Sequence, residues 1–379
     1  MMTATQAVYA IIRQHGPISR SAIHRKFNMR LATITRITGE LLGKKLIRSC
    51  GKDAAALGRS PELLQINESA FHVLGLHAVR KAIRGGIVSS GGKLESYSNF
   101  ALPENADAKC FLAALGKFAG EMLKTAKKSG IEVTGVGLAL PGEVNPQTGC
   151  LTQAAVILPG LVEVPCGTYL SGKLKLPIAV DHDTAMITLA EMLWGKGKAC
   201  QNFGALFVGH GIGGKFVIDG KLHCGSRNRS GELGHIPLRR DGAACDCGLR
   251  GCFEALASIP AIERSYAADT SFATIVERAA QGEEKAIAVL STAAGYIGEA
   301  IAIIFDMLDI ESLVINGDII AAEKTIRQAI IDTAVAHSHS KHPPNKEFIA
   351  FSSFGPEVGV LGAAAVSVTE ILAKQGVTG

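Results

Sequence analysis

Residues 232–254 read Glu-Leu-Gly-His-Ile-Pro-Leu-Arg-Arg-Asp-Gly-Ala-Ala-Cys-Asp-Cys-Gly-Leu-Arg-Gly-Cys-Phe-Glu. This stretch offers one imidazole and three thiols, those of His235, Cys245, Cys247 and Cys252. One nitrogen and three sulfur donors form a closed tetrahedral set for zinc. Gly248 and Gly251 lie where a chain that folds around an ion needs residues without a Cβ. We therefore expect a structural zinc that orients the flanking acids Glu232 and Glu254. The alternative is a group of small buried cysteines that bind no metal.

The composition is that of a globular intracellular protein. The chain has 379 residues, of which 47% are hydrophobic and 19% charged, enough for two or three domains with substantial cores. We expect no apolar run of the ~18 residues that a membrane span needs, and the N-terminus lacks the pattern of a secretion signal. The six cysteines outside the zinc stretch are scattered singly, which is typical of a reduced compartment. We expect a cytoplasmic protein without membrane insertion.

The positive charge is concentrated at the N-terminus. Residues 1–66 carry eleven Lys and Arg against three Asp and Glu, whereas the whole chain has a net charge of only +5. The remainder is therefore mildly acidic. A basic head on an acidic body favours a polyanionic partner for the head alone, although a basic face can also be merely solvated.

The head has the pattern of a helix-turn-helix domain. Apolar residues at helical spacing predict a first helix through Ile12, which His15-Gly16-Pro17 ends. Ser19 is a plausible N-cap for a short second helix, and Asn28-Met29 make the turn. A third helix is expected from about residue 30 to 45, with Ile34, Ile37, Leu41 and Leu42 facing inward. Its polar face would carry the residues that read DNA in the major groove. These are Arg30, Thr33, Thr35 and Arg36.

Two short strands are expected to follow, at 46–48 and 62–66, joined by a basic tip. They would form a wing, and Arg59 beside Gly58 would enter the minor groove. The sequence thus predicts a winged helix-turn-helix DNA-binding domain at 1–70. The alternative is a helical module that binds a protein.

The body contains an internal repeat. Residues 71–88 read as two apolar strands followed by Gly92-Lys93-Leu94, and residues 205–218 read as two strands followed by Gly220-Lys221-Leu222. We interpret this as a duplication that gives two α/β lobes, each opened by a β-hairpin. The expected ranges are 71–182 and 183–379, with the C-terminal helix returning to the first lobe. Ligands of such folds bind in the cleft between lobes.

Two motifs of the body each allow a structural and a functional interpretation. Gly209-His210-Gly211-Ile212-Gly213-Gly214 matches G-x-G-x-x-G, but a strand is expected after it, so we reject a dinucleotide site. A glycine turn between strands can still present N–H groups to an anion. Asp181 and Asp183 follow a strand and enter a helix, where either acid could be a helix cap. The functional alternative makes Asp183 a hydroxyl-binding carboxylate or general base.

At these residues the chain resembles the ROK family, which groups repressors and sugar kinases. The most specific likeness is Gly231-Glu232-Leu233-Gly234-His235 followed by the cysteine stretch ending at Glu254. The resemblance covers about residue 5 to the C-terminus. It implies a two-lobed, actin-like (ribonuclease H-like) sugar-kinase fold with a structural Zn²⁺. It also implies sugar contacts, with Asp183 at the position of the kinases' catalytic base. The implied sugar-binding residues are Gly142, His182, Asp183, Glu232, His235 and Glu254.

The chain also departs from the family's kinases. They open the first lobe with Asp-x-Gly-Gly-Thr-Lys, whereas this chain has His77-Ala78-Val79-Arg80-Lys81-Ala82. Without those glycines the backbone cannot approach phosphate as closely. His182 replaces the usual Asn before the catalytic Asp, and 158–160 lie where many members have a sugar-contacting Asn. The resemblance therefore predicts a degenerate phosphate loop and Asp183 as a vestigial base, with no catalytic residue.

We expect a transcriptional regulator, a repressor that a sugar or sugar phosphate releases from operator DNA. An ATP-dependent sugar kinase with an accessory head is the alternative, and a protein-docking module whose body ignores sugar is a third. Two heads that read a palindrome require twofold symmetry, so we expect a homodimer or homotetramer. The resemblance also leaves open a phosphotransferase-system protein as partner.

Overall fold

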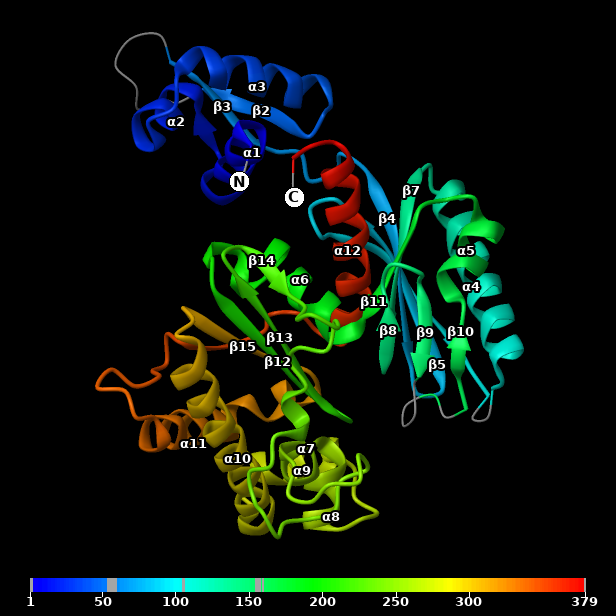
Figure 1. Cartoon of the computed structure of the whole chain (residues 1–379), viewed down its shortest axis with the longest axis vertical. Helices are drawn as coiled ribbons and strands as arrows, with labels where there is room; N and C mark the ends of the chain where they lie inside the picture. Colours follow the sequence, from blue (N-terminus) through cyan, green and yellow to red (C-terminus); the bar gives the residue numbers. More distant parts are fainter. Residues whose placement is uncertain (1–2, 53–59, 104–105, 154–157, 159, 378–379) are drawn as a thin grey trace. The chain divides into compact units, whose positions relative to one another are not determined.

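The computed structural model describes residues 3–52, 60–103, 106–153, 158 and 160–377 (Figure 1). These residues form two compact units, which are described separately. The first comprises the described part of 1–183 together with 360–377. The second is Thr184–Gly359.

The N-terminal head has the expected three helices and wing strands. The helices are α1 (Ala4–His15), α2 (Arg20–Phe27) and α3 (Leu31–Gly43), and the strands are β1 (Ile18–Ser19), β2 (Ile47–Lys52) and β3 (Glu62–Ile66). The strand order is β1-β3-β2, and β2 and β3 are antiparallel. Figure 1 shows α3 beside β2 and β3. The winged helix-turn-helix is thereby confirmed.

Local signals set the boundaries of the head's helices. The Ser19 hydroxyl accepts a hydrogen bond from the Ala22 amide, which confirms the predicted cap of α2. Asn28 adopts φ 50°, the left-handed conformation that ends α2. Ile34, Ile37 and Leu41 are fully buried, but Leu42, which was also expected to face inward, is half-buried because it lies at the edge of the inward stripe.

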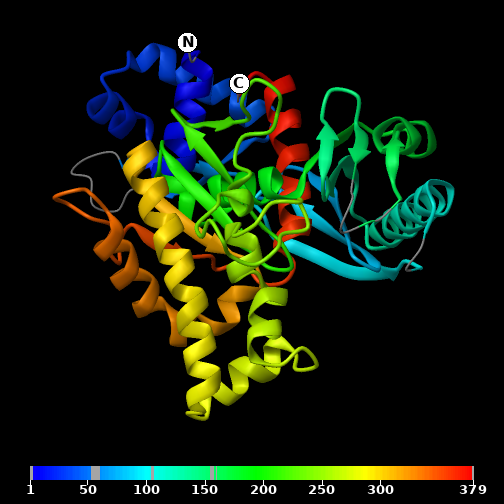
Figure 2. The same ribbon diagram turned by 60° about the horizontal axis from the view of Figure 1, so that its bottom comes forward.

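The first unit's main sheet has five strands in the order β11-β7-β4-β5-β6. Their bounds are β4 (His72–Val79), β5 (Ala82–Ser89), β6 (Leu94–Ala101), β7 (Val133–Leu140) and β11 (Ile178–His182). Strands β4, β7 and β11 are parallel, and β4-β5-β6 form an antiparallel meander. Helices α4 (Ala108–Lys128) and α5 (Cys166–Leu174) lie side by side (Figure 2). A small sheet contains β8 (Glu143–Asn145), β9 (Cys150–Gln153) and β10 (Val162–Val164).

The C-terminal helix α12 (Val358–Lys374) packs directly on this sheet. Two strand glycines permit the contact. A Cβ on Gly137 would lie 1.6 Å from the carbonyl oxygen of Ala363, and one on Gly75 would lie 2.2 Å from that of Val360. Any side chain at Gly75 or Gly137 would therefore push α12 away from β4 and β7.

The second unit repeats the topology of the first. Its sheet has the order β14-β13-β12-β15-β16, with an antiparallel β12-β13-β14 meander and parallel β12, β15 and β16. The strands are β12 (Phe203–Val208), β13 (Ile212–Ile218), β14 (Lys221–His223), β15 (Ser312–Asn316) and β16 (Ile349–Phe351). The shared order confirms the duplication inferred from the repeated hairpin pattern.

Six of the twelve α-helices among the described residues lie wholly or mostly in this second unit. They are α6 (Asp183–Trp194), α7 (Phe253–Ala257), α8 (Ile259–Tyr266), α9 (Phe272–Ala280), α10 (Glu284–Leu308) and α11 (Glu323–His337), with short 3-10 turns η1 (Lys196–Ala199), η2 (Leu233–His235) and η3 (Asp318–Ala322). Helices α10 and α11 run alongside each other (Figures 1 and 2).

Helix α10 corrects one expectation. It is a 25-residue helix, long and apolar enough by composition to cross a membrane, although no such segment was expected. Ten of its residues are buried, among them Leu290, Ile297 and Ile301 in the core of the second unit. A helix in the middle of a core can be apolar on more than one face, which explains its composition.

Candidate functional site

Three groups of side chains carry the predicted chemistry: the exposed face of α3, the cysteine loop, and the acids at the ends of β11 and in α7. On α3, Arg30, Thr35 and Arg36 are exposed, and Thr33 is half-buried. Arg30 precedes the first helical residue and is its N-cap position. Arg59, the predicted minor-groove contact, lies outside the described residues.

Arg36 is held by an acid of its own helix. Its Nη1 lies 2.6 Å from Glu40 Oε1, an i,i+4 pair in which both side chains are about half exposed. Exposed pairs of this kind contribute only ~0.3–0.5 kcal/mol. A DNA phosphate or base edge can therefore compete for the guanidinium at small cost.

Arg20, which sequence analysis did not single out, connects three elements of the head. Its Nε donates to Thr38 Oγ1 of α3 at 2.7 Å, and its Nη1 donates to Glu62 Oε2 of β3 at 2.6 Å. The hydrogen bond from Arg20 lowers the pKa of Glu62 below its ordinary value. This network fixes α3 relative to α2 and the wing. No local pattern reveals it, because Arg20 and Glu62 are far apart in the chain.

The four predicted zinc ligands converge. One ligand atom from each of His235, Cys245, Cys247 and Cys252 lies within 4.8 Å of the others. His235 Nδ1 is 3.7 Å from Cys245 Sγ, and Cys247 Sγ is 3.7 Å from Cys252 Sγ. A tetrahedral site with Zn–S distances of about 2.3 Å has edges of about 3.8 Å, so the donor set and its dimensions fit a metal ion.

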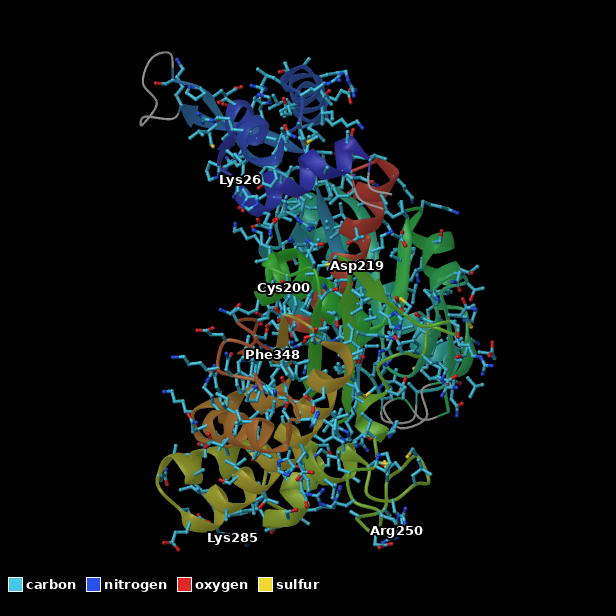
Figure 3. The ribbon with its side chains drawn as sticks, turned by 60° about the vertical axis from the view of Figure 1, so that its left-hand side comes forward. Lys26, Cys200, Asp219, Arg250, Lys285 and Phe348 are labelled. Carbon is cyan, nitrogen blue, oxygen red and sulfur yellow. The ribbon has the colours of Figure 1, made fainter. Side chains whose placement is uncertain are left out.

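The loop that carries these ligands bends as expected. Gly248 and Gly251 have φ values of 89° and 68°, a region that side chains disfavour. A Cβ on Gly251 would lie 1.4 Å from the carbonyl oxygen of Arg239. The Arg239 guanidinium in turn pairs with Glu299 of α10 and lies 5.0 Å from the ring centroid of Tyr296. Arg250, labelled in Figure 3, lies on the loop between the second and third thiols.

The loop also positions the two flanking acids. Glu232 is exposed and immediately precedes η2. Glu254, in α7, accepts a hydrogen bond from the Ile212 amide at 2.7 Å. Ile212 is the first residue of β13, next to the glycine turn that joins the antiparallel strands β12 and β13. The rejection of a dinucleotide fingerprint is thus confirmed, and one amide that could have faced an anion faces a carboxylate.

In the first unit, His182 ends β11 and Asp183 begins α6. Asp183 Oδ1 lies 3.4 Å from His182 Nδ1, and Asp183 Oδ2 lies 3.7 Å from His77 Nε2. Asp181 Oδ1 accepts a hydrogen bond from the His182 amide. Gly142, the predicted sugar-loop glycine, follows β7 with φ 89° and is exposed. Sequence analysis noted His77 as a departure from the kinases but did not foresee its contact with Asp183.

Comparisons with known proteins agree with this architecture. The ROK family model matches residues 74–370. The DNA-binding transcriptional dual regulator NagC of Escherichia coli K12 is 28% identical over 340 residues, which are 86% of this chain and 82% of NagC. A glucokinase of Halalkalibacterium halodurans is 30% identical over 254 residues, 62% of this chain and 76% of the kinase.

Among solved structures, too, the chain is similar to both a regulator and a kinase. A ROK family transcriptional regulator, described as a homologue of Escherichia coli Mlc, superposes with a TM-score of 0.79 at 27% identity and covers 98% of this chain and 96% of its own. A ROK glucokinase from Streptomyces griseus, with glucose and AMPPNP, has a TM-score of 0.69 at 21% identity and covers 78% of this chain and 99% of its own. The kinase fold is thus present, and the regulator matches nearly the whole chain. The chain belongs to the ROK family.

Proposed function

We propose that this protein is a DNA-binding transcriptional regulator of sugar metabolism, a repressor that a sugar or sugar phosphate releases from its operator. One observation carries the proposal. A winged helix-turn-helix with an exposed Arg30, Thr35 and Arg36 precedes a ROK body, and a ROK regulator superposes on 98% of the chain. The relatives NagC and Mlc are DNA-binding transcriptional regulators, and a further relative is a xylose repressor.

The residues proposed to contact the effector are Gly142, His182, Asp183, Glu232, His235 and Glu254. Carboxylates accept hydrogen bonds from sugar hydroxyls, and imidazoles can both donate to them and accept from them. His235 would have two roles, since its Nδ1 faces the cysteines and Nε2 remains for a hydroxyl.

A structural zinc ion is proposed at His235, Cys245, Cys247 and Cys252. The ion would hold the loop that ends at Glu254 and thereby fix that carboxylate. Three thiolates and one imidazole leave no open position, so the ion would supply no catalytic water.

We further propose domains at 1–70, 71–182 and 183–379, a homodimer or homotetramer that reads a palindromic operator, and a cytoplasmic location. We also propose a phosphotransferase-system protein as a candidate partner to be tested. Twofold symmetry of the protein would match half-sites on the order of 10 or 20 base pairs apart.

Selection of bound duplexes from a random DNA library tests DNA binding, and fluorescence anisotropy with the selected duplex then tests a panel of hexoses, N-acetylhexosamines and their phosphates. We expect a palindromic site and its release by one class of sugar. Failure to enrich any sequence would contradict the proposal. Enrichment without release by any sugar would favour a protein signal instead.

The second candidate is a sugar kinase, which the acid at Asp183 and the glucokinase relative favour. His77 opposes it, because the family resemblance implies an acid in the kinases at this position, whereas this chain has a buried imidazole near the end of β4. Incubation with ATP, Mg²⁺ and the same sugars decides between them. Turnover that Asp183→Asn abolishes would establish the kinase.

A further inference from the structure

A lysine lies inside the buried part of strand β13 in the second unit. Lys215 is only 4% exposed, and its neighbours Gly214 and Phe216 are buried as well. Lysine is almost never fully buried unless its ammonium group is paired. Because the transfer of a charge out of water costs free energy, the place of Lys215 in the interior indicates a contact that needs the charge.

The ammonium of Lys215 holds the loop that follows strand β14, residues 224–231. Its Nζ donates to the carbonyl oxygen of Ser230 at 2.6 Å. The hydroxyl oxygen of Ser230 lies 3.4 Å from Nζ, and the carbonyl oxygen of Asn228 lies 3.5 Å from it. A lysine ammonium has three N–H donors, and the loop offers three oxygen acceptors. An aliphatic side chain of similar length would have no donor for any of them.

The backbone of the loop is shaped to meet this ammonium. Gly225, Asn228 and Gly231 have φ values of 73°, 57° and 86°, so the chain turns sharply at three points. The Ser230 amide donates to the carbonyl oxygen of Cys224 at 3.1 Å and closes the loop. Ser230 is thereby tied both to the start of the loop and to strand β13.

Glu232 follows this loop directly, and its side chain is exposed. On its N-terminal side, the Gly214 amide donates to the carbonyl oxygen of Gly231 at 3.1 Å, and a Cβ on Gly231 would lie 1.9 Å from the carbonyl oxygen of Gly214. On its C-terminal side, His235 belongs to the cluster of potential metal ligands. Glu232 therefore lies between two fixed points, one on the strand that carries Lys215 and one in the cysteine loop.

A carboxylate on a fixed backbone binds a sugar hydroxyl with a smaller loss of entropy than one on a mobile loop. We propose that Lys215 is a positioning residue of the effector site: its ammonium orders residues 228–231 and thereby places the Glu232 carboxylate for a sugar hydroxyl. The inference rests on the proposed sugar-responsive function. It adds to that function a residue that is buried in β13 and acts through Glu232.

Two measurements on the full-length protein test this role. Hydrogen–deuterium exchange of residues 224–232 reports the order of the loop without sugar, and isothermal titration with the panel of hexoses, N-acetylhexosamines and their phosphates reports binding. Lys215→Met, which has a similar length but no N–H donor, should exchange faster in the loop and not in α10. Its affinity for the sugar that the wild type binds should fall roughly ten-fold, because only part of the molecules would hold the competent loop conformation.

Variants with related chemistry separate positioning from a loss of stability. Lys215→Arg, which keeps the charge and the donors, should recover most of the affinity. Lys221→Met removes the same charge from an exposed residue of β14 and is the matched control, so it should leave exchange and affinity unchanged. Ser230→Ala, which keeps the lysine, should have smaller effects in the same direction if Lys215→Met folds poorly.

A double-mutant cycle shows whether Lys215 acts through Glu232. In a Glu232→Ala background, Lys215→Met should cause little further loss of sugar affinity, because both changes remove the same contact. An equal loss with and without Glu232 would overturn the proposal, as would unchanged loop exchange or unchanged sugar affinity in Lys215→Met. If the wild type bound no sugar of the panel, the proposed function and the positioning role would both fail. The two failures are distinguishable, because the positioning role fails alone only when the wild type binds a sugar.

Discussion

Arg20 Nε donates to Thr38 Oγ1 at 2.7 Å, and Thr38 is a fully buried residue of α3. The same guanidinium reaches Glu62 on the wing strand β3. One side chain therefore sets the position of the proposed recognition helix against both α2 and the wing, although Arg20 need not contact DNA.

Removal of the Arg20 contacts should weaken operator binding, because α3 would no longer be held in place against α2 and the wing. Arg20→Ala leaves the Thr38 hydroxyl without its donor and should destabilise the protein by about 1 kcal/mol. Operator affinity should fall several-fold, with little change in the slope of affinity against salt, since no phosphate contact is removed. Arg25→Ala, which removes an exposed charge of α2, is the control. Anisotropy titrations at several salt concentrations measure both quantities, and a slope that changes as much as in a phosphate-contact variant would refute the positioning role.

The Arg20–Glu62 pair should also make the stability of the head depend on pH. The folded-state pKa of Glu62 is lowered, so its contribution is present at neutral pH and is lost as the pH falls through the lowered pKa. Because the Glu62 side chain is 42% exposed, the loss should stay within ~0.2–1 kcal/mol. Chemical denaturation between pH 3 and 7 should show a smaller acid destabilisation in Glu62→Gln than in the wild type.

Arg36 should influence which operator is chosen. If it contacts a base edge, Arg36→Ala should cost about 1–3 kcal/mol at the selected site and much less on random DNA. Glu40→Gln, which frees Arg36 from its partner, should instead strengthen binding to both. Equal losses of binding free energy on selected and random duplexes would indicate that Arg36 contacts the phosphate backbone and not a base edge.

The zinc site should respond to its most exposed ligand. Cys247→Ser should lower zinc content and destabilise the second unit, because the loop from His235 to Glu254 loses its closure. Cys110→Ser changes an exposed cysteine of the first unit and serves as control. Elemental analysis and thermal unfolding measure the two effects. One zinc per chain in Cys247→Ser would remove this thiol from the ligand set.

Glu191 should make the second unit less stable at high pH. Burial raises its pKa, although Ser352 Oγ and the Lys196 amide donate to the carboxylate and act in the opposite direction. An acid with a raised pKa stabilises the fold fully below its unfolded pKa, and this contribution declines as the pH rises through the folded value. Glu191→Gln should flatten the decline in stability between pH 5 and 8, whereas Glu277→Gln on the exposed face of α9 should not.

The local structure and the types of metal ligand could be predicted from neighbouring residues. Helix caps, the Asn28 turn and the repeated strand-turn-strand pattern depend on neighbouring residues, so the winged head and the duplicated hairpins could be predicted. The four metal-binding side chains lie within one short stretch, and their chemistry was readable from their spacing.

Contacts between residues that are distant in the sequence depend on how the whole chain folds. His77 meets Asp183 because β7 lies between β4 and β11, an order that no local pattern specifies. Arg20 meets Glu62 only because β3 pairs with β1 beside α2, and Glu254 meets the Ile212 amide because α7 lies against the β12-β13 turn. Hydrophobic periodicity predicts which face of each segment is buried. The strand order and the packing of the folded chain determine which of these faces and polar groups come into contact.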